Sequence, residues 1–156
     1  MDPLIHYRRP KKEIWSGRID SMDNYDAFRW HQLVEFIDLN GSESRIKPLS
    51  GGETGICFIG FCSDEGVRRN LGRTGAAKGP ESIRLEMANL PCSFSRRIRL
   101  FDAGDIYVDD EDLETGQAQL GSAVEAILER GLFPIVLGGG HETAYGNYQG
   151  VRSFLG

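Results

Sequence analysis

The sequence is poor in cysteine, in histidine and in long apolar runs, and each shortage excludes a class of protein. It contains 3 cysteines and 3 histidines in 156 residues. The cysteines, Cys57, Cys62 and Cys92, form no C-x-x-C pair, so a cysteine-based zinc site is not expected. Their odd number is typical of reduced, mostly buried thiols. No apolar run approaches the roughly 20 residues that a membrane helix needs.

Positive charge is also scarce, since the formal net charge is -5. Surfaces that bind nucleic acid usually carry a basic stripe, so neither DNA nor RNA is an expected partner. The first 15 residues, MDPLIHYRRPKKEIW, lack the apolar centre of roughly 7–15 residues that marks a secretory signal. We therefore expect a cytoplasmic protein that binds neither a membrane nor nucleic acid.

The length and the composition, with 40% hydrophobic and 26% charged residues, fit one globular domain with a sizeable core. Residues 1–50 have a mixed composition and are expected to form an N-terminal extension. Within it, Phe28, Leu33, Phe36 and Ile37 lie near helical spacing, which predicts a helix around 23–38.

From residue 55 onward, short apolar runs alternate with amphipathic segments, which predicts βαβ units and a parallel sheet. This βαβαβ core spans 55–156. Strands are expected at 56–61, 97–106 and 133–137. Helices are expected at 79–90 and 115–131, and a third is expected just after His141.

Two of these helices carry an apolar stripe that is expected to pack on the sheet. In the first helix the stripe consists of Ile83, Met87 and Leu90. In the second it consists of Leu120, Val124, Ile127 and Leu128, and Gly131 provides a C-terminal cap.

The loops 62–78, 103–112 and 138–141 are expected at the carboxyl ends of the three strands, where open parallel sheets bind ligands. The second of these loops leads into a run of acidic residues. We interpret that run as a solvated loop, with an opportunistic cation site as the alternative. Its members are Asp109, Asp110, Glu111, Asp112 and Glu114.

The third strand runs into Gly138-Gly139-Gly140 and then His141. Glycines before a helix also build phosphate-binding loops, but the spacing matches neither the dinucleotide nor the P-loop pattern. A histidine at the end of a buried strand points into the cleft, where imidazole commonly binds a metal or acts as a base. The alternative is a tight turn in which His141 bonds locally.

The stretch LGGGHETAYGNYQG, residues 137–150, resembles the histidine signature of the arginase/agmatinase/formimidoylglutamase (ureohydrolase) family. Its G-G-G-H-E is similar to the formimidoylglutamase branch, because arginases and agmatinases usually have an acidic residue before the histidine and a serine after it. Four upstream stretches also match the family: WSGRID (15–20), RWHQLV (29–34), GFCSDEGVRRNLGRTGAAKGPESIR (60–84) and DAGDI (102–106).

The resemblance implies a three-layer αβα fold with a parallel sheet, of which residues 1–156 form the first half as a single domain. It also implies a hydrolase of linear amidines that converts N-formimidoyl-L-glutamate to L-glutamate and formamide in histidine catabolism. Such enzymes use two manganese ions to activate a water molecule, because bound metal lowers the pKa of water. His141 matches the family's first histidine ligand.

The remaining metal ligands of the family come from a D-x-H-x-D motif and a D-x-D motif, and neither follows His141 in this sequence. No catalytic residue is therefore assigned, and the chain alone is expected to be inactive with an incomplete manganese site. Two alternatives are another ureohydrolase, of the agmatinase or guanidinobutyrase type, and an inactive fragment that only folds and associates.

A half-sheet would leave an unpaired edge strand and uncovered apolar surface. Members of the resembled family are also commonly oligomers. A homo-oligomer is therefore expected.

Three arginines, Arg68, Arg69 and Arg73, lie on the glycine-rich loop at the same end of the sheet. Arginine binds carboxylates bidentately, so Arg69 or Arg73 is a candidate for binding a carboxylate of the substrate. The alternative for these arginines is an ion pair with Asp64 or Glu65, or simple exposure to solvent.

Glu142 follows the candidate metal ligand directly. One hypothesis is that it orients His141 or lies beside the metals, as residues around metal ligands do. The alternative is that it only interacts with the dipole of the helix that begins there.

Overall fold

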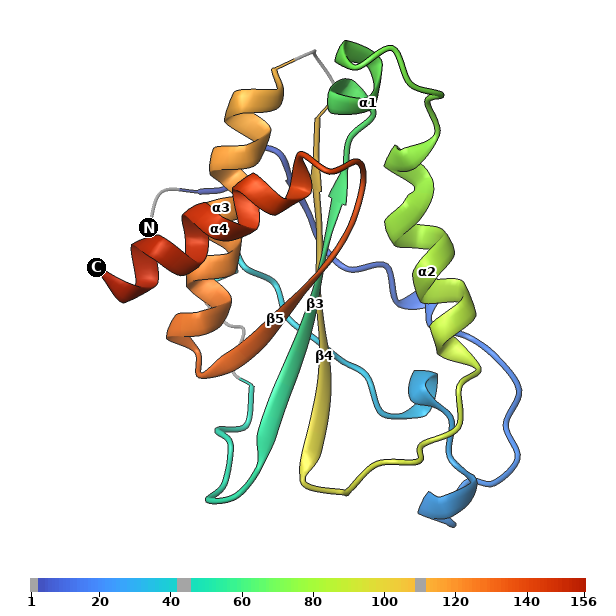
Figure 1. Ribbon diagram of the computed structural model, residues 1–156. Helices are drawn as coiled ribbons and strands as arrows, with labels where there is room; N and C mark the ends of the chain where they lie inside the picture. The colour runs from blue at the N-terminus through green and yellow to red at the C-terminus, as the bar shows by residue number, and fades with distance from the viewer. Residues whose placement is uncertain (1–2, 42–45, 109–111) are drawn as a thin grey trace.

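The computed structural model describes residues 3–41, 46–108 and 112–156. These residues form one five-stranded sheet with helices on both of its faces (Figure 1). The strands are β1 (Tyr7–Arg8), β2 (Glu35–Phe36), β3 (Thr54–Cys62), β4 (Ile98–Tyr107) and β5 (Leu132–Leu137). The α-helices are α1 (Glu65–Arg69), α2 (Gly79–Ala88), α3 (Leu113–Glu129) and α4 (Thr143–Leu155). None of these described helices is long and apolar enough to cross a membrane.

β3 lies at the centre of the sheet and pairs in parallel with β4 on one side and with β5 on the other. The far edge of β4 carries two short strands, β1 in the antiparallel and β2 in the parallel direction. The three predicted strands and their parallel arrangement are therefore confirmed, with bounds that shift by one or two residues.

Helix α2 lies on one face of the sheet, whereas α3 covers the other and α4 packs across α3 (Figure 1). Successive side chains of a strand point to opposite faces, so β3 contributes to two separate cores. Cys57, Ile59 and Phe61 join the cluster that includes α3, and Phe58 joins the cluster that includes Ala88 of α2. The three-layer arrangement implied by the family resemblance is therefore present.

The predicted apolar face of α3 is confirmed, since Leu120, Val124 and Ile127 are completely buried. Asp112 begins the helix by accepting a hydrogen bond from the backbone nitrogen of Thr115 at 3.1 Å. The chain leaves the helix through Gly131, whose φ of +72° lies in the left-handed region that glycine adopts readily.

The predicted apolar face of α2 is confirmed only at Met87, which is partly buried against the cluster that includes Ala88, and is wrong at its other two positions. Ile83 and Leu90 are partly exposed, at 38% and 42%, and the helix instead buries Pro80, Arg84 and Ala88. These three residues follow the i, i+4, i+8 spacing of one helix face. A charged side chain lies on the buried face because carboxylates of β4 pair with it.

The helix predicted around 23–38 is also wrong. This segment forms 3-10 turns at Tyr25–Ala27 and Trp30–Gln32, and then strand β2. Its backbone pairs with other segments, because Trp30 donates to the carbonyl of Leu90 and Ile37 donates to that of Asp102. Tertiary hydrogen bonds thus override a helical spacing of apolar residues.

The three cysteines are free and buried, as expected. Burial raises the pKa of all three thiols, and that of Cys62 reaches about 12. The thiolate is the reactive form, so these side chains are protonated and inert at neutral pH.

A buried ion cluster connects α2 to β4. The guanidinium of Arg84, 1% exposed, donates to Asp102 at 2.8 and 2.9 Å, to Asp105 at 2.7 Å and to the Gly104 carbonyl at 2.8 Å. Trp15 donates its indole N–H to Asp102 at 2.6 Å. Four of the five N–H groups of the Arg84 guanidinium and the indole N–H of Trp15 thus donate to acceptors in the interior, as buried charges require.

A bulge in β4 makes this cluster possible. Phe58 pairs with Asp102 and Gly60 pairs with Asp105, so β4 carries one extra residue opposite β3. Without it, Asp102 and Asp105 would point to opposite faces of the sheet. Gly104, with φ of +81°, provides the irregularity, and a Cβ there would collide with the backbone of Arg8.

We expect Arg84→Met to destabilise the chain by about 3–5 kcal/mol, because it leaves two buried carboxylates without their cation. Urea unfolding followed by circular dichroism measures the change. The matched control is Arg97→Met, since Arg97 is exposed, and it should change the free energy of unfolding by less than about 0.5 kcal/mol. Similar losses for the two variants would show that the ion cluster does not stabilise the fold.

Candidate functional site

The carboxyl ends of the three long strands lie at one edge of the sheet, and the loops that follow them are joined by backbone hydrogen bonds. Val108 donates to the carbonyl of Cys62, and Gly139 donates to the carbonyl of Phe61, both at 3.1 Å. The loop after β4 and the loop after β5 are therefore both held against the end of β3. The predicted meeting of loops 62–78 and 138–141 is confirmed, whereas residues 103–107 of the predicted loop 103–112 belong to β4 and residues 109–111 lie outside the described part of the chain.

The glycines before His141 let the backbone of this loop lie close to its neighbours, and they are not needed for an unusual φ. A Cβ on Gly139 would lie 3.0 Å from the carbonyl oxygen of Phe61 and 3.1 Å from that of Ser63. A Cβ on Gly140 would collide with the carboxylate of Glu142. None of these positions has a positive φ. The glycines thus let the loop press against β3 while it carries His141 outward.

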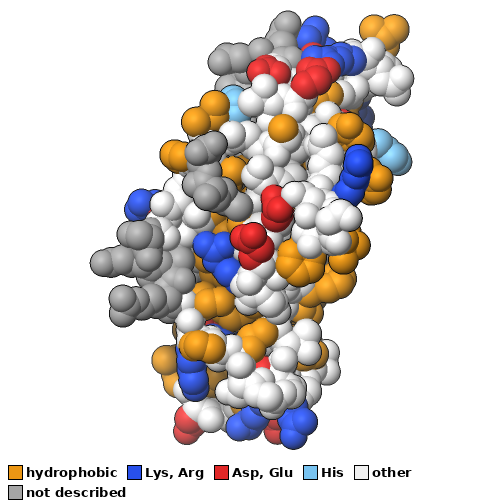
Figure 2. Space-filling view, turned by 90° about the vertical axis from the view of Figure 1, so that its left-hand side faces the viewer, with side chains coloured by type: hydrophobic (Ala, Val, Ile, Leu, Met, Phe, Trp, Pro, Cys, Tyr) orange, Lys and Arg blue, Asp and Glu red, His pale blue; other side chains and the backbone are white. Residues whose placement is uncertain are grey.

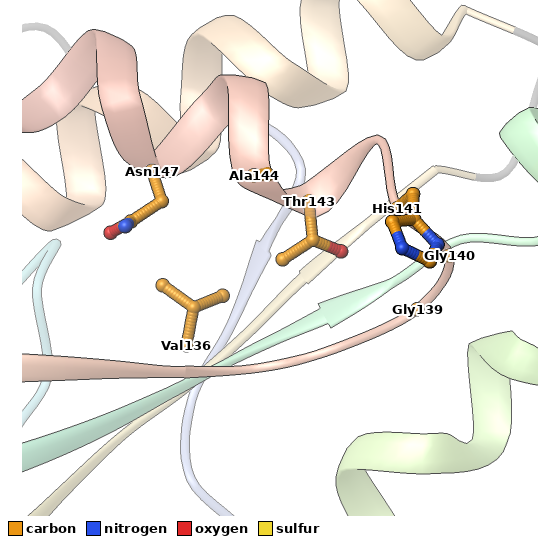
Figure 3. A pocket seen from close by; sticks show the side chains of 7 residues that line it. All are labelled: Val136, Gly139, Gly140, His141, Thr143, Ala144 and Asn147. Carbon is orange, nitrogen blue, oxygen red and sulfur yellow. The ribbon is translucent and has the colours of Figure 1, made fainter.

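His141 is exposed at the turn between β5 and α4. Its side chain lies at one end of an open hollow of about 460 Å³, which Figure 3 shows between the end of β5 and the first turns of α4. This volume falls within the range of about 300–1,000 Å³ that is common for small-molecule sites. The other side chains in this hollow belong to Val136, Thr143, Ala144 and Asn147.

Glu142 turns its carboxylate away from this hollow and toward α1. The carboxylate lies in the space that a Cβ on Gly66 or Gly140 would occupy. Its Oε1 is buried and has no hydrogen-bond partner within the described part of the chain. No hydrogen bond joins Glu142 to the His141 ring, and its carbonyl accepts from Gln117 of α3 at 3.0 Å. Glu142 therefore contacts the loop around His141 and not the imidazole.

A second hollow, of about 300 Å³, lies where the histidine loop meets α1 and the residues that follow it. The two segments are 70 positions apart in the sequence, counted from Asn70 to Gly140. The hollow thus brings the arginine-rich loop and His141 to one site. Its lining residues are Gly66, Val67, Asn70, Gly72, Gly140, His141 and Glu142.

Arg69 is held by two carboxylates. It donates to Glu65 at 2.7 Å and to both oxygens of Glu114 at 2.5 and 3.1 Å. Arg68 donates to the same Glu65 at 2.8 and 2.9 Å. The hydrogen bonds that Arg69 donates to Glu114 and Glu65 raise its pKa further above the usual range. Of the predicted alternatives for these two arginines, the ion pair with Glu65 is the one present.

Arg73 differs from both, because it is exposed and makes no ion pair or hydrogen bond with another described residue. It follows Gly72, which lines the second hollow. Asp64 does not pair with an arginine here. Its Oδ1 accepts from the backbone nitrogens of Gly75 at 2.8 Å and Ala77 at 3.0 Å, which closes the loop that carries Arg73.

The acidic run lies only partly within the structure, since Asp109, Asp110 and Glu111 are outside the described residues. Asp112 caps α3, and Glu114 accepts hydrogen bonds from Arg69. These two residues therefore have specific partners and are not simply part of a solvated loop. Among residues 3–41, 46–108 and 112–156, no group of three or more His, Cys, Asp or Glu side chains is placed to hold a metal ion.

Sequence reasoning missed the roles of Asp64 and Glu114. Asp64 precedes α1 and is of the residue type that caps helices and turns, so its position gave a usable signal. Glu114 lies 45 positions from Arg69, and nothing in the local pattern connects the two.

Comparison with known proteins identifies the family of the chain. The model of the arginase family matches residues 54–156. The chain belongs to the arginase family. It is 56% identical over 151 residues to a formimidoylglutamase of Clostridium tetani, covering 97% of this chain and 44% of that protein. It is 46% identical over 150 residues to a formimidoylglutamase of Geobacillus thermodenitrificans, covering 96% and 45%. The chain thus spans less than half the length of these relatives.

Solved structures of the family agree with the fold. An arginase superfamily protein from Trypanosoma cruzi superimposes with a TM-score of 0.58 and 36% identity, over 65% of this chain and 36% of that one. A formiminoglutamase of the same organism, determined with Mn²⁺, gives a TM-score of 0.56 and 37% identity over the same fractions. The α/β fold of this family member is therefore arginase-like.

Hydrogen bonds from Arg68 and Arg69 lower the pKa of Glu65. The pKa of Glu65 is thus lower in the folded chain than in the unfolded chain, where it is about 4.3. The ionised carboxylate therefore stabilises the folded chain fully at a pH above this unfolded value, and the stabilisation is lost as the pH falls through the folded pKa. We therefore expect amide protection around α1 to fall on acidification below about pH 4. Hydrogen exchange, corrected for intrinsic rates, measures this protection.

In the Glu65→Gln variant, protection around α1 should be low already at neutral pH and should show no acid step. Glu86→Gln, at an exposed position of α2, should behave like the unmodified chain. An acid step of unchanged size in Glu65→Gln would assign the pH dependence to another group.

Proposed function

We propose that this chain is the N-terminal half of a formimidoylglutamase, which hydrolyses N-formimidoyl-L-glutamate to L-glutamate and formamide. The observation that carries the proposal is the 56% identity to the Clostridium tetani formimidoylglutamase over 97% of this chain. The G-G-G-H-E stretch at the end of β5 agrees with that assignment. A cytoplasmic location and a homo-oligomeric state remain predictions.

His141 is proposed as a manganese ligand. Its exposure at the carboxyl end of β5, beside an open hollow, supports this role. Imidazole and carboxylate oxygens are ligands that suit manganese. The described residues supply this single candidate ligand, which is too few for two ions. The rest of the manganese site must come from outside the described residues, and the chain by itself is expected to be inactive.

Glu142 is proposed to position the loop that carries His141. Its carboxylate fills the space between Gly66 of α1 and Gly140, where a larger residue at either position would displace it. A change in this contact would move the turn just before His141. Glu142 is thus proposed to act on the imidazole through the backbone and not through a direct hydrogen bond.

Arg73 is proposed to bind a carboxylate of the substrate, in preference to Arg69. Two carboxylates already satisfy Arg69, and removing it from them would leave Glu65, with a side chain only 7% exposed, short of one partner. Arg73 is exposed beside the hollow that ends at His141. A planar guanidinium in this position suits a dicarboxylate such as formimidoylglutamate and would repel a guanidinium substrate.

A direct test joins residues 1–156 to the part of the Clostridium tetani relative that lies beyond the matched region. This chimera, loaded with Mn²⁺, should release formamide and glutamate from formimidoylglutamate, and the isolated chain should not. His141→Asn should reduce the manganese content of the purified chimera. Preferential hydrolysis of agmatine or guanidinobutyrate would assign the other ureohydrolase activity, and a folded chimera without hydrolysis would reject the enzyme proposal.

In the same chimera, Arg73→Ala should raise KM for formimidoylglutamate by about 10- to 100-fold with little change in kcat, since a charged bidentate hydrogen bond contributes about 1.5–3 kcal/mol. Arg97→Ala is the control for the loss of an exposed arginine and should leave KM unchanged. Arg69→Ala should mainly lower the thermal midpoint. An unchanged KM for Arg73→Ala would remove this residue from the binding role.

A further inference from the structure

The segment that joins α1 to α2 carries Arg73 and is exposed over most of its length. Residues 71–75 are all exposed, and no hydrogen bond joins Arg73 or Thr74 to another described residue. The segment lies at the carboxyl end of β3, at the top of Figure 1. A stretch with so few contacts of its own is easily moved, so its conformation depends on how its two ends are held.

The first end is held by α1, which an ion pair attaches to the rest of the molecule. Arg69 of α1 donates to Glu114 of α3. Figure 2, which keeps the vertical direction of Figure 1, shows acidic and basic side chains gathered at the top, the end that carries α1. The backbone nitrogens of Leu71 and Gly72 then donate to carbonyls of α1, at 3.0 and 2.8 Å. The chain is thus placed as far as the residue before Arg73.

The second end is held by the side chain of Asp64. One carboxylate oxygen, Oδ1, accepts from the backbone nitrogen of Gly75 at 2.8 Å and from that of Ala77 at 3.0 Å. Asp64 occupies the N-cap position of α1, where an aspartate usually accepts from its own helix, yet its side chain makes no such bond. The carboxylate instead bonds to residues 11 and 13 positions later.

Asp64 has a fixed place because it lies next to the core. It follows β3 directly, between Ser63 and Glu65, which are 0% and 6% exposed. Its own carbonyl accepts from the backbone nitrogen of Arg68 at 2.8 Å. The backbone that carries the carboxylate is therefore fixed relative to the sheet, and the two amides that bond to the carboxylate are held with it.

Gly75 is the point at which the segment would move if Asp64 did not hold it. Its φ of +129° is a value that other residues rarely adopt, and a Cβ there would meet no atom within 4 Å. Glycine has the widest choice of backbone conformations, so a Gly75 without its hydrogen bond would let residues 73 and 74 take many positions. The bond to Asp64 thus limits where the guanidinium of Arg73 can lie.

We propose that Asp64 is a positioning residue that holds Arg73 where it binds the carboxylate of the substrate. The inference rests on the proposed function, because Arg73 is assigned there to that carboxylate. Asp64 acts through two backbone amides and does not contact the substrate. A segment that spends only part of its time in the binding conformation binds the substrate more weakly by that fraction.

Substitutions in the chimera test this role. Asp64→Ala removes both hydrogen bonds, and KM for formimidoylglutamate should rise about tenfold with little change in kcat, as expected when the binding conformation falls to about a tenth of the population. Asp64→Asn should restore most of the affinity, because its neutral oxygen still accepts, though less strongly than a charged one. The control is Asp26→Ala, at an exposed aspartate whose carboxylate accepts no hydrogen bond from the described residues, and it should change neither constant.

A double variant distinguishes the positioning of Arg73 from a general loss of structure. If Asp64 acts through Arg73, Asp64→Ala should raise KM no further when Arg73 is already alanine, because residues that act as a unit are not additive. A rise by the same factor in both backgrounds would overturn the inference, and so would an unchanged KM in the single variant. Asp64→Asn with the KM of Asp64→Ala would also overturn it, since the hydrogen bonds would then not explain the effect.

Trypsin gives a readout that needs no activity, because it cleaves after arginine where the backbone is mobile. In the 156-residue chain, Asp64→Ala should raise the rate of cleavage after Arg73 severalfold, taken relative to cleavage after the exposed Arg97. Asp64→Asn and Asp26→Ala should not raise it. Mass spectrometry of the fragments measures both rates.

The outcomes separate this inference from the proposed function. An unchanged rate of cleavage after Arg73 in Asp64→Ala would overturn the inference, even if the chimera hydrolyses formimidoylglutamate. Faster cleavage, together with a folded chimera that hydrolyses nothing, would reject the proposed function and support the positioning of Arg73 by Asp64.

Discussion

The pairing of Arg84 with Asp102 and Asp105 is the interaction on which the rest of this structure depends. It joins α2 to β4 in the interior, and Trp15 connects the N-terminal extension to the carboxylate of Asp102. Burial raises the pKa of Asp105 even though Arg84 lies beside it, so the cluster is costly unless every partner is present. Its members come from three of the sequence stretches that resemble the family, at 15–20, 60–84 and 102–106. These stretches therefore contribute to the interior of the molecule.

The candidate site depends on this scaffold without sharing residues with it. The loop from α1 to α2 ends at the helix that Arg84 anchors, and Asp64 closes the loop at its other end. Within it, Arg69 is committed to Glu65 and Glu114, whereas Arg73 remains exposed near the hollow that His141 lines. A rigid frame with exposed polar groups on its loops is the usual construction of a binding site.

The sequence predicted the three long strands, the buried face of α3 and the cap at Gly131, because each follows from a local period or a local conformation. The face of α2 could not be predicted this way. Arg84 is buried because carboxylates on a strand 18 and 21 positions later neutralise it, and a bulge puts both on one side. The helix predicted around 23–38 was wrong for a similar reason, because the backbone of this segment forms hydrogen bonds with β4 and with the residues after α2, which are distant in the sequence. His141 was located through its glycines, whereas the hydrogen bond from Arg69 to Glu114, 45 positions later, follows from no local pattern.

The contact between α3 and α4 has a consequence for the proposed metal ligand, His141. Three glycines, Gly121, Gly146 and Gly150, let the backbones of the two helices touch. Gln117 of α3 donates to the carbonyl of Glu142, and Glu125 of α3 accepts from the hydroxyl of Ser153. The turn that carries His141 is thus fixed at both ends, by β5 before it and by α4 after it. Its ordering entropy is lost when this half of the domain folds and not when a ligand arrives. The backbone that carries His141, the proposed manganese ligand, is therefore ordered before any metal binds, and binding need not include the cost of ordering that backbone.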